Sequence, residues 1–270
     1  MSGADARRLA PTTMAALATA LALGAGAAGV EAQALASRVA SAPDGWVRFE
    51  YESRPGVCGN GDWITFNDEE GRVYGRRGGS CDCVCEEGPI RVEMRVRDGE
   101  PLDLEAEVGG TWRERENVTD LGVVPPDEAA DYLLSLAERS RTEAGEEAIF
   151  PATLARGVET WPRLLEIARS AALTDTRRQA VFWLGQEASE RATEGLTSII
   201  DDEDELEVRE HAVFALSQQN QTRAVDALIR IARAHPEPAL RKRAIFWLGQ
   251  RGDDPRVLDF LEELLTGGPR

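Results

Sequence analysis

The stretch LRKRAIFWLGQ, residues 240–250, decides the fold because its pattern recurs along the chain. TRRQAVFWLGQ occupies residues 176–186, AVFALSQ residues 212–218 and AIFPATL residues 148–154, so the alanines at 148, 180, 212 and 244 are spaced by 32 positions. A second apolar series, Tyr132, Leu164, Leu196, Leu228 and Phe260, keeps the same spacing. Two series that share one period predict a helical hairpin in each repeat. Such hairpins stack because neither helix can bury its apolar face alone.

Helix breakers fall between the predicted helices and set the limits of this region. They include Gly185, Gly249, Pro236 and the run GDDP at residues 252–255. Helical spacing begins after a pair of prolines at 125 and 126. We therefore expect a solenoid of four to five hairpins over residues 125–270.

The repeats carry a family resemblance. TRRQAVFWLGQ and LRKRAIFWLGQ resemble the first helix of bacterial HEAT-like repeats of the phycobilisome-lyase type, and DPRVLDFLEELL at residues 254–265 is similar to the matching second helix. Gly185 and Gly249 match the turn glycine of that family, whereas Ala152 and Ser217 replace it. The resemblance implies an α-solenoid. The chain shows no signature of a chromophore lyase, so no lyase activity is carried over.

The segment before the repeats predicts strands. Apolar and polar residues alternate with a period of two in residues 46–51, 63–67, 90–97 and 102–108. Asp98-Gly99 between the last two indicates a hairpin, because glycine accepts positive φ. We expect a small antiparallel β domain over residues 45–124, which makes the fold class α+β.

The N-terminus has the pattern of a signal peptide over residues 1–32. Arg7 and Arg8 precede an uncharged stretch from Met14 to Val30, and small residues suited to cleavage follow. The alternative is a retained membrane anchor, for which this Ala/Gly-rich run is short. Residues 33–44 are small and polar and are expected to form a linker. These features predict an exported protein, periplasmic or extracellular, with no membrane span after cleavage.

All four cysteines, Cys58, Cys81, Cys83 and Cys85, lie in the predicted β domain. Export would place them in an oxidising compartment, where small domains are commonly held by disulfides. Cys58 pairing with Cys81 or Cys85 closes a sizeable loop. A four-thiolate zinc site and a redox-active Cys-x-Cys pair are the alternatives, although the usual CxxC spacing of zinc sites is absent.

Charge and motifs exclude several functions. The net charge is −17, from 31 basic and 48 acidic residues, and no basic stripe suited to nucleic acid is visible. His211 and His235 are the only histidines and do not form a ligand cluster, so we expect no metal, no cofactor and no enzymatic activity.

The most suggestive feature is a row of phenylalanines and glutamines. Phe182 with Gln186, Phe214 with Gln218, and Phe246 with Gln250 each lie one helical turn apart, and Phe150 extends the row without a glutamine. If exposed, this ladder suits an extended segment or a helix of a protein partner. The alternative is that each phenylalanine packs between successive hairpins.

The sequence thus predicts an exported protein-binding scaffold with a partner and an oligomeric state that it does not identify. A metal- or thiol-dependent activity of the cysteine-rich β domain is one alternative. A purely structural role in envelope assembly is the other.

Overall fold

The computed structural model describes residues 35–61, 64–67, 73–76, 86–186, 190–219, 222–252 and 254–267. The strands are β1 (Gly45–Tyr51), β2 (Val57–Gly59), β3 (Ile64–Asn67), β4 (Val73–Arg76), β5 (Glu86–Glu87), β6 (Ile90–Arg97), β7 (Glu100–Glu107) and β8 (Val118–Val123). The helices are α2 (Pro126–Arg139), α3 (Glu143–Glu147), α4 (Ile149–Thr153), α5 (Trp161–Ser170), α6 (Thr174–Gln186), α7 (Glu190–Asp202), α8 (Leu206–Gln218), α9 (Thr222–Ala234), α10 (Pro238–Gly249) and α11 (Pro255–Thr266). Strands precede helices, so the α+β class is confirmed.

The larger sheet has the strand order β7-β6-β1-β8. β6 and β7 form the predicted hairpin, and its turn residues Asp98 and Gly99 have φ of 52° and 76°. β1 pairs antiparallel with β6 but parallel with β8, so this sheet is mixed and not wholly antiparallel. The segment between β7 and β8 passes from one edge strand of the sheet to the other. As a result, β8 runs in the same direction as β1.

A smaller sheet has the order β4-β3-β2-β5, and each of its pairs is antiparallel. Its strands are only two to four residues long. Such a small sheet buries little apolar surface of its own. A disulfide at Cys58 in β2 adds a covalent restraint.

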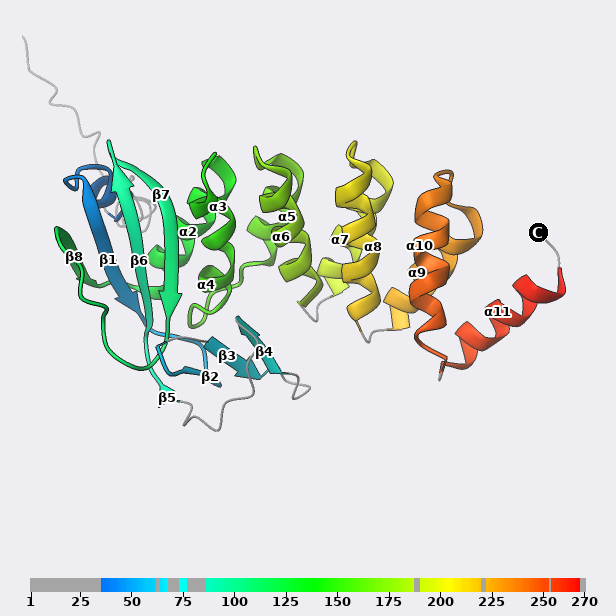
Figure 1. The fold of residues 1–270 in the computed structure, drawn as a ribbon. Coiled ribbons are helices and arrows are strands. Elements are labelled where there is room, and N and C mark those ends of the chain that lie inside the picture. Colours follow the sequence, from blue (N-terminus) through cyan, green and yellow to red (C-terminus); the bar gives the residue numbers. More distant parts are fainter. Residues whose placement is uncertain are drawn as a thin grey trace, which may run out of the picture.

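The larger sheet closes the N-terminal end of the solenoid (Figure 1). Its inward side chains, among them Phe49 and Met94, share one continuous core with the helices. The Tyr51 hydroxyl donates to the Pro151 carbonyl in α4 at 2.7 Å. The Leu104 amide donates to the carboxylate of Glu147 in α3 at 2.8 Å. The sheet is thus a cap on the helical stack and shares its core.

Residues 35–40, expected to belong to a linker, form a helix. Leu35 and Val39 are buried there, with exposed fractions of 0% and 1%. The Leu35 amide also donates to the carboxylate of Glu128 in α2 at 2.9 Å. The small, polar composition suggested a linker, but two apolar residues four positions apart supply a helical face that packs on the core.

The predicted helical period is confirmed. Alanines 148, 180, 212 and 244 are fully buried, and Tyr132, Leu164, Leu196, Leu228 and Phe260 are at most 6% exposed. Small alanines let the helices approach closely, and the larger residues of the second series fill the space between them. The pairs α5 and α6, α7 and α8, and α9 and α10 succeed one another along the stack, and α11 follows at its far end (Figure 1).

Candidate protein-binding surfaces

Three helices, α6, α8 and α10, form one layer of the solenoid, and α5, α7 and α9 form the other. α8 contacts α6 and α10 over more of its length than α7 contacts α5 and α9. The layer of α6, α8 and α10 is therefore the inner, shorter side of the stack. Small side chains permit this approach, because Gly185 of α6 lies directly against Ala215 of α8.

The predicted phenylalanine column lies at the contacts between successive helices of this layer. Phe150 stacks on Trp183, with 4.9 Å between ring centroids and 22° between ring planes. Phe214 packs on Trp247 at 5.0 Å. In each pair, the phenylalanine meets the tryptophan that lies one position after the equivalent phenylalanine of the next repeat.

Exposure rises along the column toward the C-terminus. Phe150 is 7% exposed, Phe182 and Phe214 are half-buried, and Phe246 is 54% exposed. The equivalent of Trp183 in the next repeat is the smaller Ala215, and Phe182, which packs edge-on against Trp183 of its own helix, is half-buried. The column therefore combines packing between repeats with partial access from the inner side.

The glutamines follow the same gradient. Gln186 and Gln218 are half-buried, and Gln250 is exposed. Gln218 donates through Nε2 to the Ser217 hydroxyl at 3.2 Å. Partly accessible amides beside partly accessible rings offer both hydrogen bonds and apolar contact. We call Phe182, Gln186, Phe214, Gln218, Phe246 and Gln250 the inner strip.

A polar row runs beside the inner strip. The Nε of Arg178 in α6 donates to Nε2 of His211 in α8 at 3.0 Å. Burial and the neighbouring Arg178 cation lower the pKa of His211. Arg243 of α10 pairs with Glu210 of α8. A shallow pocket of about 350 Å³ opens here, lined by Glu210, Ala239, Lys242, Arg243 and Phe246.

The opposite layer is covered by ion pairs between successive repeats. Arg163 of α5 pairs with Glu138 of α2 at 2.9 Å. Arg256 of α11 pairs with Asp226 of α9 at 3.0 Å. Such exposed pairs contribute little free energy, and they leave this face hydrated and charged. The aromatic inner strip and the charged outer layer are therefore chemically different surfaces.

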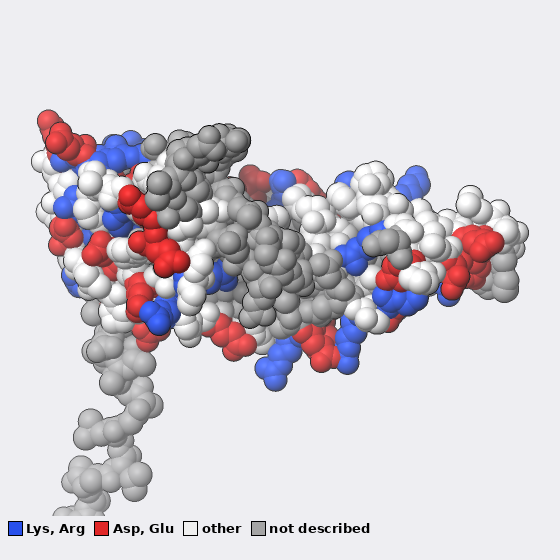
Figure 2. Space-filling view, turned by 90° about the horizontal axis from the view of Figure 1, so that it is seen from below, with Lys and Arg blue, Asp and Glu red and all other residues white. Residues whose placement is uncertain are grey.

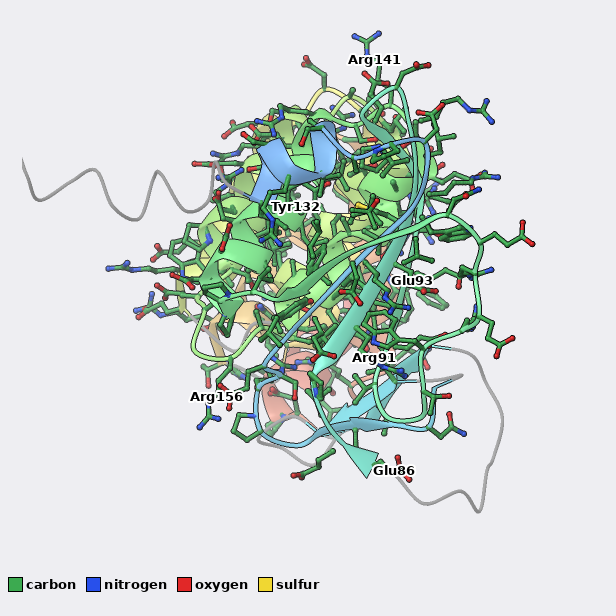
Figure 3. All side chains as sticks on the ribbon, turned by 90° about the vertical axis from the view of Figure 1, so that its left-hand side faces the viewer. Glu86, Arg91, Glu93, Tyr132, Arg141 and Arg156 are labelled. Carbon is green, nitrogen blue, oxygen red and sulfur yellow. The ribbon has the colours of Figure 1, made fainter. Side chains whose placement is uncertain are left out.

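The outward face of the larger sheet carries arginines, glutamates and tryptophans that the sequence analysis had not singled out. Arg91 and Glu93 project from β6 on the side of the molecule that is remote from α11 (Figure 3). Arg91 lies 3.5 Å from Glu107 and stacks over Trp112 at 5.2 Å. Burial raises the pKa of Glu107, although Arg113 and Arg91 oppose the shift. These contacts hold the segment between β7 and β8 across the sheet, and they include neither a histidine nor a cysteine.

The two histidines lie in different surroundings. His235 is buried in the turn between α9 and α10, and its Nδ1 accepts from the Glu237 amide at 3.0 Å at the start of α10. His211 lies between α6 and α8. Across the described residues, no three histidine, cysteine or acidic side chains come together in a way that could hold a metal ion.

Of the four cysteines, one lies within the described residues. Cys58 is disulfide-bonded. Cys81, Cys83 and Cys85 lie outside the described residues, so the pairing with Cys81 or Cys85 stays a prediction. The predicted signal peptide, residues 1–32, also lies outside them. No helix in the described ranges is both long and apolar enough to cross a membrane.

Acidic and basic side chains are interspersed over the described part of the face that Figure 2 shows. Arg223 with Glu190 and Arg233 with Glu263 illustrate the mixing, since opposite charges from successive repeats neutralise one another. A nucleic-acid surface would instead gather unpaired basic groups.

Stacked helical hairpins with a 32-residue period and buried repeat positions define an α-solenoid. The HEAT repeat family model matches residues 161–234 and 194–270, which supports a HEAT-like repeat region there. No curated protein matches the chain. The finer likeness to the phycobilisome-lyase type stays a prediction.

Proposed function

We propose that this protein is an exported scaffold that binds another protein along the inner strip. The observation that carries the proposal is the row of partly exposed phenylalanines and glutamines on α6, α8 and α10. HEAT repeats present extended surfaces to protein partners, and the repeat spacing sets such groups at regular intervals.

The strip suits an extended segment or a helix that carries apolar side chains at intervals. Its rings can receive these side chains, and its amides can bind backbone or side-chain polar groups. The pocket between α8 and α10 places Lys242 beside Phe246, while Arg243 is paired there with Glu210. We therefore expect the partner to carry an acidic group next to an apolar one at this point.

Export rests on the N-terminal pattern of residues 1–32 and on the disulfide at Cys58, because disulfides persist in oxidising compartments. No reaction is assigned to the protein. Its proposed role is to hold a partner in the periplasm or outside the cell.

Site-specific photo-crosslinking tests the strip. A photoreactive phenylalanine analogue placed at Gln186 or Gln218 should capture one partner from envelope extract, using the chain from Gln33 onward, which contains every described residue. The same analogue at Arg230, in the outer layer, should not capture it. Equal capture from both layers, or capture from Arg230 alone, would contradict the proposal.

A matched pair of truncations separates binding from folding. Phe182→Ala with Phe214→Ala should abolish capture while helical content is kept. Ile229→Ala, which removes a partly buried apolar side chain from α9, should leave capture unchanged. If a folded Phe182→Ala, Phe214→Ala chain binds the partner as well as the unchanged chain does, the phenylalanines serve packing alone.

A further inference from the structure

One segment of the chain lies across the outward face of the larger sheet in the manner of a bound peptide. Residues 109–117, which we call the strap, lie between β7 and β8. Arg113 and Arg115 of the strap are half-buried, whereas Glu114 and Glu116 are exposed. This alternation is typical of an extended segment that turns every second side chain toward a surface.

The two strap arginines neutralise three glutamates of the sheet. The Arg113 guanidinium pairs with the Glu105 carboxylate of β7 and lies 2.6 Å from that of Glu107 on the same strand. The Arg115 guanidinium lies 3.2 Å from the Glu105 carboxylate and 3.5 Å from that of Glu93 on β6. Each arginine therefore bridges two carboxylates, and Glu105 contacts both arginines.

Without the strap, the sheet would bring like charges together. Glu93 and Glu105 lie directly opposite each other on neighbouring strands, and such a pair destabilises a sheet when both residues are ionised. Glu93 is only 4% exposed, and its Oε1 atom has no hydrogen-bond partner among the described residues. A buried carboxylate is costly unless a cation lies beside it. This face is therefore a site for basic groups, which the strap fills in part.

The strap is attached firmly only at its two ends. At one end the Gly110 amide donates to the Glu86 carboxylate at 3.4 Å, and at the other the Trp46 amide donates to the Asn117 carbonyl at 3.0 Å. Residues 111–116 make no backbone hydrogen bond with another described residue, and none of them is fully buried. Such a segment opens at a lower free energy than the strands beneath it.

We propose that the strap is a built-in ligand, and that the sheet face beneath it binds an extended basic segment of a partner protein when the strap lifts. The partner segment carries two arginines at alternate positions, the spacing of Arg113 and Arg115. An aromatic residue precedes them, as Trp112 does in the strap, because its ring lies 4.8 Å from the Arg48 guanidinium and 5.2 Å from that of Arg91. This surface is separate from the inner strip, which lies on α6, α8 and α10.

Its covalent attachment makes the strap an effective competitor for this face. A short flexible link keeps the strap arginines at an effective concentration on the order of 1 mM. A partner segment therefore occupies the face only when it binds more tightly than the strap or when the strap is weakened. Removal of the strap side chains should raise the affinity of the face for a basic peptide.

Fluorescence anisotropy of a labelled synthetic peptide tests the proposal with the chain from Gln33 onward. The peptide has the sequence of residues 110–117. A variant with Trp112→Ser, Arg113→Ser and Arg115→Ser should bind this peptide about tenfold more tightly than the unchanged chain does, because the tethered competitor is gone. A folded variant that does not bind the peptide at concentrations up to about 1 mM would overturn the proposal.

A peptide of equal charge separates recognition from general attraction to an acidic chain. Its composition is the same, but its two arginines are adjacent, so both cannot face the sheet when the peptide is extended. It should bind the strap variant about tenfold more weakly than the first peptide does. Equal binding of the two peptides would reveal charge attraction alone and would overturn the proposal.

Two substitutions in β7 locate the peptide on the sheet. Glu105→Gln, added to the strap variant, should weaken peptide binding about tenfold, because this carboxylate contacts both arginines. Glu100→Gln, at an exposed position of the same strand, should leave binding unchanged. Equal effects of the two changes, or a larger effect of Glu100→Gln, would place the peptide elsewhere and contradict the proposal.

Circular dichroism checks that the strap variant keeps its fold. If it does not, Arg113→Gln alone takes its place, and this variant should bind the peptide more tightly than the unchanged chain does. Equal affinity of these two proteins would then overturn the proposal. None of these changes touches the inner strip. Crosslinking from Gln186 therefore tests the scaffold function separately, and either result can fail without the other.

Discussion

Gly185 of α6 and Ala215 of α8 are in such close contact that a Cβ added to Gly185 would lie 2.7 Å from the Ala215 Cβ and 3.1 Å from its carbonyl oxygen. In the sequence, Gly185 is a position that recurs in the repeats, as Gly249 does. The structure shows that it is needed for the approach of two helices, because the atoms opposite include backbone that cannot rotate away.

Gly185→Ala should lower the free energy of unfolding by about 1–3 kcal/mol, the usual cost of forcing extra volume into a packed interface. Gly249→Ala adds the same methyl group where no atom lies within 4 Å. It should be neutral or stabilise by up to about 1 kcal/mol, because alanine favours helix over glycine. Urea unfolding at low protein concentration measures both. Equal destabilisation by the two changes would show that the α6–α8 approach is not the cause.

The sheet and the solenoid should unfold together, because they share one core. Tyr51→Phe removes the buried hydrogen bond to the Pro151 carbonyl and should cost about 1–2 kcal/mol. Tyr132→Phe is the control, since its hydroxyl donates to the Met94 sulfur, a weak acceptor, at 3.4 Å. Its cost should be smaller.

Circular dichroism and tryptophan fluorescence should report one common transition for both tyrosine variants. Because tryptophans lie both in the sheet region and in the helices, two separate transitions would instead mean that the sheet and the solenoid unfold independently.

Acid should weaken the contact between α6 and α8 through His211. Burial and Arg178 lower its pKa, so the unfolded chain binds a proton more readily than the folded chain. The contribution of neutral His211 to the free energy of unfolding is therefore complete above its unfolded-state pKa of about 6.5. It is lost as the pH falls below that value toward the pKa in the folded chain. Glu207 and Glu210 oppose the shift, and Arg243 adds to it.

His211→Gln should flatten this dependence, because glutamine keeps a hydrogen-bond acceptor and does not titrate. Urea unfolding of both proteins between about pH 5 and pH 8 isolates the contribution as a difference. If the stability difference between the two proteins does not change over this interval, His211 does not couple protonation to folding.

Cys58 should resist alkylation in the folded, unreduced protein because its sulfur is in a disulfide. Peptide mapping without reductant should find it linked to the peptide that carries Cys81, Cys83 and Cys85, with Cys81 or Cys85 as the expected partner. Reduction should render it reactive. A Cys58 that is alkylated without reductant, or a link to a second chain, would contradict this expectation.

Local pattern was enough to predict several elements. The 32-residue period predicted the two buried series, and Asp98-Gly99 predicted the β6–β7 hairpin. Both predictions were possible because burial on one helical face and positive φ in a turn depend on residues close in sequence. The phenylalanine and glutamine positions of the inner strip followed from the same period. Their exposure did not, because it depends on what a neighbouring helix places against each ring: Trp183 covers Phe150, whereas no described helix covers Phe246.

The sequence by itself determined that the C-terminal half forms repeated helical hairpins and that strands precede them, since period and residue type act within each element. Only the tertiary structure decided that β8 runs parallel to β1, that residues 35–40 join the core as a helix, and that the sheet caps the first repeat. It alone showed that Arg113 and Arg115 lie across the glutamates of the sheet. These features depend on contacts between segments far apart in the chain, where the free energy comes from surfaces that meet only after folding.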